Sequence, residues 1–240
     1  MTKEIVIAAY DKDVSWMEEF DGNIKRTIYR KGFKPNNENE IYLEPNLGRC
    51  VHTFFNHIHE NYENFSDYTF FAQDYPFDHW EDIIEVINGG VETYAAHSSI
   101  KIGGYWGFHF NTNKPNTKIN VKDLNGNITE LTVGMMWSMP TSQQFGSGNV
   151  LSCHSNGMPQ DHNPNINIDE FWDILFDHPK PNIYEFIPGG HFGATKEHLQ
   201  LRSKEFYKKI SELLIENINT PWVVERLECY IFNPKYKTKL

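Results

Sequence analysis

The stretch DYTFFAQDYPFDHW, residues 67–80, places a continuous apolar run directly before a group of polar side chains. Such a run, ended by polar residues, predicts a buried strand over 68–72. A second run of this kind, EIVIAAY (4–10), stops at Asp11. Buried strands of this type are found inside parallel α/β sheets, so the two runs predict neighbouring sheet strands with polar residues at their ends.

Helices alternate with strands along much of the chain. GRCVHTFFNHIHENY (48–62) has apolar residues at helical spacing and predicts a helix packed on the sheet. Further strands are predicted at 24–30 and 183–188, a hairpin at 118–133 around Asn125-Gly126, and helices at 78–90, 168–176, 196–218 and 222–232. With no repeat or linker, we predict an α/β single domain over 1–240, whose mixed, mainly parallel sheet has helices on both faces.

Two segments have the composition of loops. KPNNENEIYLEPN (34–46) is rich in asparagine and proline, which argues against a regular element. Residues 138–167 are rich in Gly, Ser, Asn and Pro, which predicts a long functional or mobile loop that orders over a ligand.

Composition excludes several classes of protein. The 240 residues carry a net charge of −10, which argues against bulk electrostatic binding of nucleic acid. Three cysteines without CxxC spacing indicate reduced thiols and a cytoplasmic protein rather than a disulfide framework or a zinc site. No segment approaches the ~18 apolar residues of a transmembrane helix.

The end of the strand at 68–72 is the first candidate site. In open α/β sheets, ligands bind at the carboxyl ends of the strands. A carboxylate there, at Asp74, suits a divalent cation or a sugar hydroxyl. The alternative is structural: Asp74 begins a turn and Asp78 caps the helix that starts near His79.

Two glycine-containing segments are candidate anion or ligand sites. EPNLGRC (44–50) places Asn46 and Arg49 at a helix start, where backbone N–H groups and a guanidinium suit an anion; the alternative is an Asn46 cap and a solvated Arg49. In IPGGHFGA (187–194), Gly189 and Gly190 allow a close approach of backbone and ligand, although paired glycines are also common in turns.

The last predicted helix carries charges in an apolar setting. Glu225 and Arg226 lie between WVV and LECYIF, so they are either functional or a structural ion pair. The eleven histidines do not have metalloprotease spacing.

Four stretches resemble a domain family of unknown function, with fungal, bacterial and viral members, that is itself similar to GT-A glycosyltransferases. They are IVIAAYDKDVSWM, NLGRCVHTFFNHIHENY with DYTFFAQDYPFDH, IPGGHFGATKEHLQLRSKEFY, and PWVVERLECYIF. The resemblance implies a GT-A-like domain that transfers a sugar from a nucleotide sugar, a UDP- or GDP-sugar, to a carbohydrate or other hydroxyl acceptor in glycan synthesis.

The resemblance also implies roles for single residues. Tyr10 and Asp11 would lie near the nucleoside, Asn46 and Arg49 near the donor, and Gln73-Asp74 at the place of the metal-binding DxD motif. Gly189, Gly190 and His191 would border the donor sugar, and Glu225 would be the catalytic base. Beside Glu225, we expect Arg226 either to hold the helix or to bind the donor by countering the diphosphate charge. AQD supplies one carboxylate where DxD supplies two, so Asp74 is the only metal ligand implied for Mn²⁺ or Mg²⁺.

Two other functions remain open at this level. One is a metal-dependent hydrolase using Asp74, His79 and either His97 or His154. The other is a non-catalytic carbohydrate-binding protein of the same fold, since aromatic residues make up 15% of the chain and aromatic faces stack on sugar rings.

Overall fold

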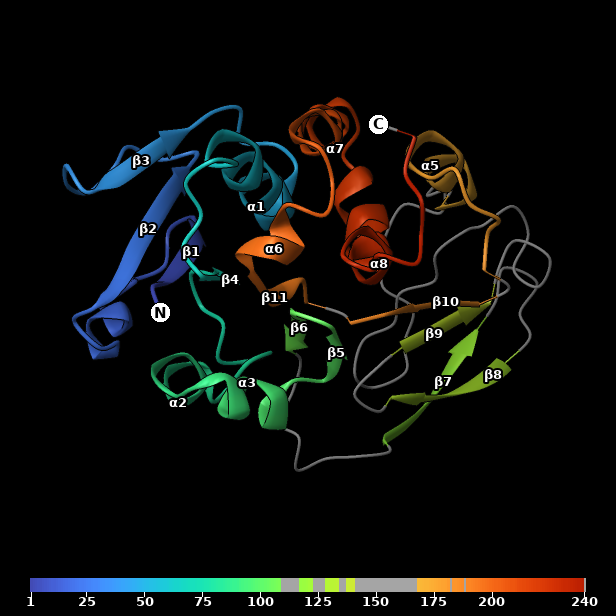
Figure 1. Cartoon of the computed structure of the whole chain (residues 1–240), viewed down its shortest axis with the longest axis horizontal. Helices are drawn as coiled ribbons and strands as arrows, with labels where there is room; N and C mark the ends of the chain where they lie inside the picture. Colours follow the sequence, from blue (N-terminus) through green and yellow to red (C-terminus); the bar gives the residue numbers. More distant parts are fainter. Residues whose placement is uncertain are drawn as a thin grey trace.

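The computed structural model (Figure 1) describes most of the chain. The described residues are 1–108, 117–122, 128–133, 137–140, 168–181, 183–187 and 189–239.

A seven-stranded mixed sheet forms the centre of the protein. Its strands, in spatial order, are β3 (Glu40–Leu43), β2 (Ile24–Lys31), β1 (Lys3–Ala9), β4 (Tyr68–Gln73), β11 (His191–Thr195), β6 (Tyr105–Phe108) and β5 (Ile100–Ile102). The first four strands are parallel, and the pairings β4–β11, β11–β6 and β6–β5 are antiparallel. The predicted mixed α/β sheet is therefore confirmed, but it is mainly parallel only in the half that contains β1.

Helices cover both faces of this sheet, as predicted. Figure 1 shows α1 (Arg49–Glu60), α6 (Lys196–Leu199), α7 (Lys204–Glu216) and α8 (Thr220–Ile231) on one side and α2 (Ile83–Asn88) with α3 (Val91–His97) on the other. Neighbouring strand residues face opposite layers: Phe71 packs into the core under α1, and Phe70 into the core over α2. Because both faces are covered there, the central strands β1 and β4 contain continuous apolar runs instead of alternating apolar and polar residues.

Two small antiparallel pairs lie beside the main sheet. β7 (Thr117–Lys122) pairs with β8 (Ile128–Val133), which confirms the predicted hairpin partners, although the turn at Asn125-Gly126 lies outside the described residues. β9 (Trp137–Pro140) pairs with β10 (Ile183–Phe186). The predicted loop 138–167 therefore begins with strand residues, and its remainder, 141–167, lies outside the described residues.

Three predictions about local structure are wrong in part. Glu40–Leu43, inside the segment expected to lack regular structure, is edge strand β3, whose one paired side is hydrogen-bonded to Ile28–Lys31. An edge strand tolerates asparagine and proline next to it because its other side needs no partner strand. The helical region 196–218 is interrupted at 200–203, since Ser203 caps α7 by accepting a hydrogen bond from the Phe206 N–H. Asp78 does not cap a helix, because α2 begins at Ile83.

Two short helices complete the described part of the chain. The 3-10 helix η1 (Ser15–Glu19) follows β1, and α5 (Ile168–Leu175) packs beside α8. Within the described ranges, none of the helices has the length and apolar character that a bilayer-spanning segment requires.

Candidate functional site

The strand order reverses at β1, and this reversal locates the candidate site. From β1 the chain adds β2 and β3 on one side, and β4 then joins β1 on the other side. The strands β1 and β4 are parallel, with Ala8 opposite Gln73, so their carboxyl ends lie side by side. This is the position at which open α/β sheets bind ligands. The structure therefore brings Tyr10 and Asp74 together at the predicted edge.

Asp74 holds the loop that follows β1. One of its carboxylate oxygens, Oδ2, accepts hydrogen bonds from the N–H groups of Tyr10 at 2.8 Å and Lys12 at 3.3 Å. Its backbone carbonyl accepts the indole N–H of Trp16 at 2.9 Å. Asp74 thus has a structural role in holding the loop after β1, and its carboxylate also lies at the sheet edge where a ligand would bind.

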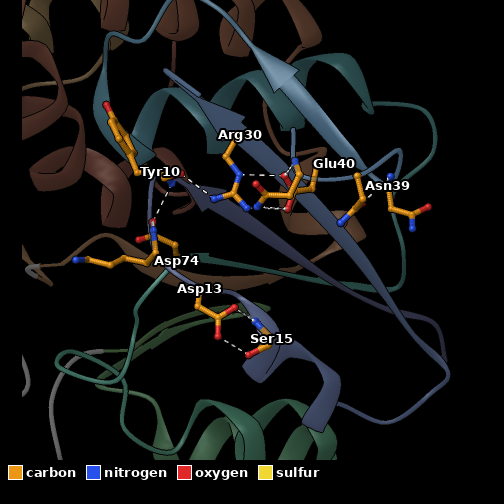
Figure 2. A network of polar contacts seen from close by, with 10 residues as sticks. Tyr10, Asp13, Ser15, Arg30, Asn39, Glu40 and Asp74 are labelled. Atoms are coloured by element: carbon orange, nitrogen blue, oxygen red, sulfur yellow. Dashed lines mark hydrogen bonds and ion pairs between the residues drawn. The ribbon is translucent and has the colours of Figure 1, made fainter. Parts of the chain in front are cut away.

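A buried ion pair supports the same loop from the other side (Figure 2). Arg30 donates to both carboxylate oxygens of Glu40, at 3.0 and 2.7 Å, and to the Tyr10 carbonyl at 2.7 Å. Hydrogen bonding to Arg30 lowers the pKa of Glu40. Sequence reasoning missed this pair; the signal was a pair of basic residues, Arg30 and Lys31, directly after the apolar residues Ile28 and Tyr29 at the end of β2.

Asn46 is bound to Tyr10 and does not cap α1. The Tyr10 hydroxyl donates to Asn46 Oδ1, while the residue preceding the helix is Gly48 and no side chain caps it. Burial raises the pKa of Tyr10, and the positive charge of Arg49 opposes this effect. Tyr10, Asn46 and Arg49 therefore form one group at the start of α1. Asp11 lies beside them and is exposed.

Arg49 has an unusual backbone conformation. Its φ is +53°, in the left-handed region that non-glycine residues rarely adopt, and it follows Gly48 with φ +74°. Its guanidinium lies 4.4 Å from the centre of the Trp222 ring. A strained residue maintained at a helix N-terminus suggests a functional constraint.

Lys31 stabilises this strained helix start. Its side chain is fully buried and donates to the carbonyl of Leu47, to the carbonyl of Arg49 at 3.0 Å and to His52 Nδ1 at 3.2 Å. Burial lowers the pKa of Lys31 to about 8 and that of His52 to about 4, so His52 is a neutral acceptor near pH 7.

The predicted glycine segment is hydrogen-bonded both to the end of β4 and to α8. The Gln73 amide donates to the Gly189 carbonyl at 3.3 Å, and the Gly189 N–H hydrogen-bonds to the Glu225 carboxylate. Gly189 and Gly190 have φ values of +100° and +64°, which explains why glycines occupy these positions. The segment therefore places a backbone donor on a buried carboxylate.

Burial raises the pKa of Glu225, while Arg226 and the Gly189 N–H, together with the more distant charges of Arg49 and His79, oppose the increase. The shortest contact between the Arg226 guanidinium and the Glu225 carboxylate is 3.6 Å. Arg226 also donates to the Trp222 carbonyl at 2.7 Å and lies over the Phe186 ring. The position of Arg226 is therefore fixed by its contacts with Trp222 and Phe186 as well as by the Glu225 carboxylate.

Two more buried residues, Glu228 and His191, lie at the site. Of these, the sequence predicted only His191 as a site residue. Glu228, on the same face of α8 as Glu225, is 2% exposed, and burial raises its pKa well above the usual range. His191 is buried, and its ring centre lies 5.8 Å from that of His79. The signal for Glu228 was its i, i+3 spacing from Glu225 in an apolar helix.

Residues 5–237 match the model of a protein family described as a protein of unknown function, DUF3431. The chain belongs to this family. Comparison with the curated proteins and with the solved structures gave no match.

The donor atoms available for a metal in this DUF3431 protein are few. Within the described ranges, no three His, Cys, Asp or Glu side chains are grouped so that they could hold a metal ion. His97 is paired with Asp82, and His154 lies outside the described residues. The ligands of the hydrolase hypothesis are thus not gathered here, and Asp74 would be a single carboxylate with one oxygen already hydrogen-bonded to backbone.

A groove of about 810 Å³ lies beside the β1 loop of the DUF3431 domain. Its walls include Asp13 from that loop, Ser15 from η1, Arg26 from β2, and the asparagines of the 36–39 segment. Figure 2 shows Asn39 next to Glu40, and Asp13 hydrogen-bonded to Ser15 at the start of η1. Amide and hydroxyl groups of this kind offer donors and acceptors to a polar, uncharged ligand.

Proposed function

We propose that this protein is a nucleotide-sugar-dependent glycosyltransferase, a single GT-A-like domain that transfers a sugar to a hydroxyl acceptor. The observation that supports this best is a chain of contacts between segments far apart in sequence. Asp74 binds the Tyr10 N–H, Gln73 binds the Gly189 carbonyl, and the Gly189 N–H binds Glu225. These contacts join segments from all four stretches that resemble GT-A enzymes, at the sheet edge expected to bind ligand.

The charges suggest how a UDP- or GDP-sugar would lie. The groove contains three acidic residues, Asp13, Glu18 and Glu40, and one arginine, so it is unfavourable for a diphosphate but suitable for the polar nucleoside. Arg49 and the N-terminus of the 12-residue helix α1 lie near Tyr10 and suit the diphosphate. The nucleoside would thus enter the groove, and the diphosphate would point towards Arg49.

Glu225 is the proposed base of an inverting transfer. Its carboxylate takes the proton of the acceptor hydroxyl while the acceptor oxygen forms a bond to the anomeric carbon of the donor sugar. The bond from that carbon to the diphosphate breaks, and both of its electrons leave with the diphosphate. Arg49 stabilises the negative charge of the leaving group. Burial favours a base with a raised pKa, which is the direction found for Glu225.

A divalent cation, Mn²⁺ or Mg²⁺, would neutralise diphosphate charge in such a reaction. Asp74 is the one carboxylate at the DxD position, and its Oδ2 already accepts two N–H groups. This donor set does not fit a metal centre built by protein side chains alone, so the steps above use Arg49 instead.

The test is a calorimetric screen of UDP- and GDP-sugars, with and without Mn²⁺, followed by assays for sugar transfer. We expect saturable binding that requires the diphosphate, and sugar transfer to a hydroxyl acceptor. Binding of sugars without any binding of nucleotides would instead support the carbohydrate-binding alternative. Metal-dependent cleavage without transfer would support the hydrolase.

A further inference from the structure

Glu225 and Glu228 present their carboxyl groups to the same point in the protein. A Cβ atom built on Gly190 would lie 3.9 Å from Glu225 Oε2 and 3.8 Å from Glu228 Oε1. These are ordinary van der Waals distances, so both carboxyl groups, together with Val51, border the space beside Gly190 that a side chain at this position would fill. Both glutamates are buried: Glu225 is 9% exposed and Glu228 is 2% exposed.

The two carboxyl groups differ in what surrounds them. Burial raises the pKa of Glu225, whereas Arg226, the Gly189 N–H, Arg49 and His79 all favour its ionised form. Glu228 has no such groups acting on it: burial and, after it, a negative charge on Glu225 raise its pKa, and its Oε1 has no hydrogen-bond partner in the described part of the chain.

Two further titratable residues in the described part of the chain, Cys50 and Tyr105, interact with Glu228 and bring no positive charge. Cys50 on α1 and Tyr105 on β6 both have raised pKa values caused by burial, so both are neutral at pH 7. A buried carboxylate without a cation or donor is strongly unfavourable, and such a group keeps its proton instead.

We propose that Glu225 and Glu228 form a carboxyl pair with a single proton at neutral pH, carried by Glu228, and that this pair binds two neighbouring hydroxyl groups of the acceptor. The ionised Glu225 accepts a hydrogen bond from the reacting hydroxyl. The protonated Glu228 donates one to the oxygen of the adjacent hydroxyl. The acceptor is therefore a vicinal diol, as in a sugar ring. The recognition step rests on the proposed transferase function, whereas the shared proton does not.

The first experiment detects the proton directly. In protein labelled with ¹³C at the glutamate carboxyl carbons, NMR at pH 7 should show a protonated carboxyl signal that is lost in Glu228→Gln. In Glu225→Gln, the same signal should titrate at lower pH, because the neighbouring negative charge is gone. Glu216→Gln, at an exposed position on α7, is the control and should leave this signal unchanged. A wild-type spectrum without a protonated glutamate at pH 7, or a titration unaffected by Glu225→Gln, would overturn the pair.

The second experiment tests recognition without requiring transfer. A methyl glycoside with a vicinal diol and its monodeoxy analogue are titrated into the protein at pH 7, and the two carboxyl signals are followed. We expect the diol to shift both signals and to bind about tenfold more tightly than the deoxy analogue, a typical value for one hydrogen bond. Glu228→Gln should keep this preference because its amide also donates, whereas Glu228→Leu should lose it.

Equal binding of the two glycosides, or a preference retained in Glu228→Leu, would refute diol recognition. Absence of sugar transfer combined with the expected NMR results would refute the transferase proposal alone. The two proposals can therefore fail separately.

Discussion

Arg49 provides the sharpest test of the donor site, because its backbone and its side chain make opposite contributions to stability. Its φ of +53° is unfavourable for any residue with a Cβ, by about 1 kcal/mol. Its guanidinium, 4.4 Å from the centre of the Trp222 ring, contributes a cation–π interaction also worth about 1 kcal/mol. Substituting glycine removes both effects, whereas substituting alanine removes only the favourable one.

We therefore expect Arg49→Gly to have nearly the wild-type stability and Arg49→Ala to be destabilised by about 1 kcal/mol. For a chain of this length, that difference corresponds to a separation in Tm of roughly 2–4 °C. Thermal unfolding monitored by circular dichroism measures it. Lys208→Ala, which removes one exposed positive charge from α7, is the matched control and should change Tm little.

Both Arg49 variants should lose diphosphate binding to the same extent. A guanidinium–phosphate hydrogen bond is worth about 1.5–3 kcal/mol, which corresponds to roughly 10- to 150-fold in Kd. Calorimetry should show this loss for nucleoside diphosphates and an unchanged affinity for the free nucleoside. Equal losses for both ligands would refute the phosphate role, and equal melting temperatures for the two variants would refute the strain argument.

Four further outcomes follow from the site. Glu225→Gln should fold and bind donor normally but transfer sugar about 10²- to 10⁴-fold more slowly; a rate near that of the wild type would show that the base lies elsewhere. Glu228→Gln should be more stable than the wild type at pH 7. The raised pKa of Glu228 means that the unfolded chain releases its proton first, so wild-type stability falls as pH rises above about 4.5; parallel Tm–pH curves would contradict this. Asp74→Asn should lower stability by about 1 kcal/mol, since a neutral amide oxygen replaces a carboxylate that accepts two N–H groups, and unchanged denaturant unfolding would contradict it. Lys31→Met should unfold more easily at pH 7 and should lack the gain in stability that the wild type shows between about pH 8 and 10.5, where only the unfolded chain still binds the lysine proton; a persistent gain would assign that titration to another group.

The sequence predicted the parts of the fold that depend on local pattern. Continuous apolar runs predicted β1 and β4, and helical spacing predicted α1 and α8, because burial on one or both faces leaves a periodic signal. The edge strand β3 was missed because its pairing depends on β2 and on the Arg30–Glu40 ion pair, not on its own composition. The antiparallel insertion of β11 beside β4 was also not predicted, since strand order depends on long-range contacts.

The candidate site was predicted residue by residue but not as a network. Sequence reasoning selected Asp74 for a ligand, yet the carboxylate first binds the backbone of Tyr10 and Lys12. It treated Asn46 as a possible helix cap, yet Asn46 binds the Tyr10 hydroxyl. Which hydrogen bonds a polar residue makes depends on segments that approach it only in the folded chain, so residue type alone leaves these alternatives open.

The charge balance of α8 separates the roles of its two glutamates. A general base must be ionised before it accepts a proton, and a buried carboxylate is ionised only where donors or cations offset its desolvation. Glu225 has the Gly189 N–H and the Arg226 guanidinium for this purpose, whereas Glu228 has Glu225 as its charged neighbour. Exchanging the two roles would require Glu228 to ionise beside an existing negative charge. In the proposed reaction the same helix supplies one base and one acid, because the Gly189 N–H and the Arg226 charge act on Glu225, whereas the charge that acts on Glu228 is that of Glu225.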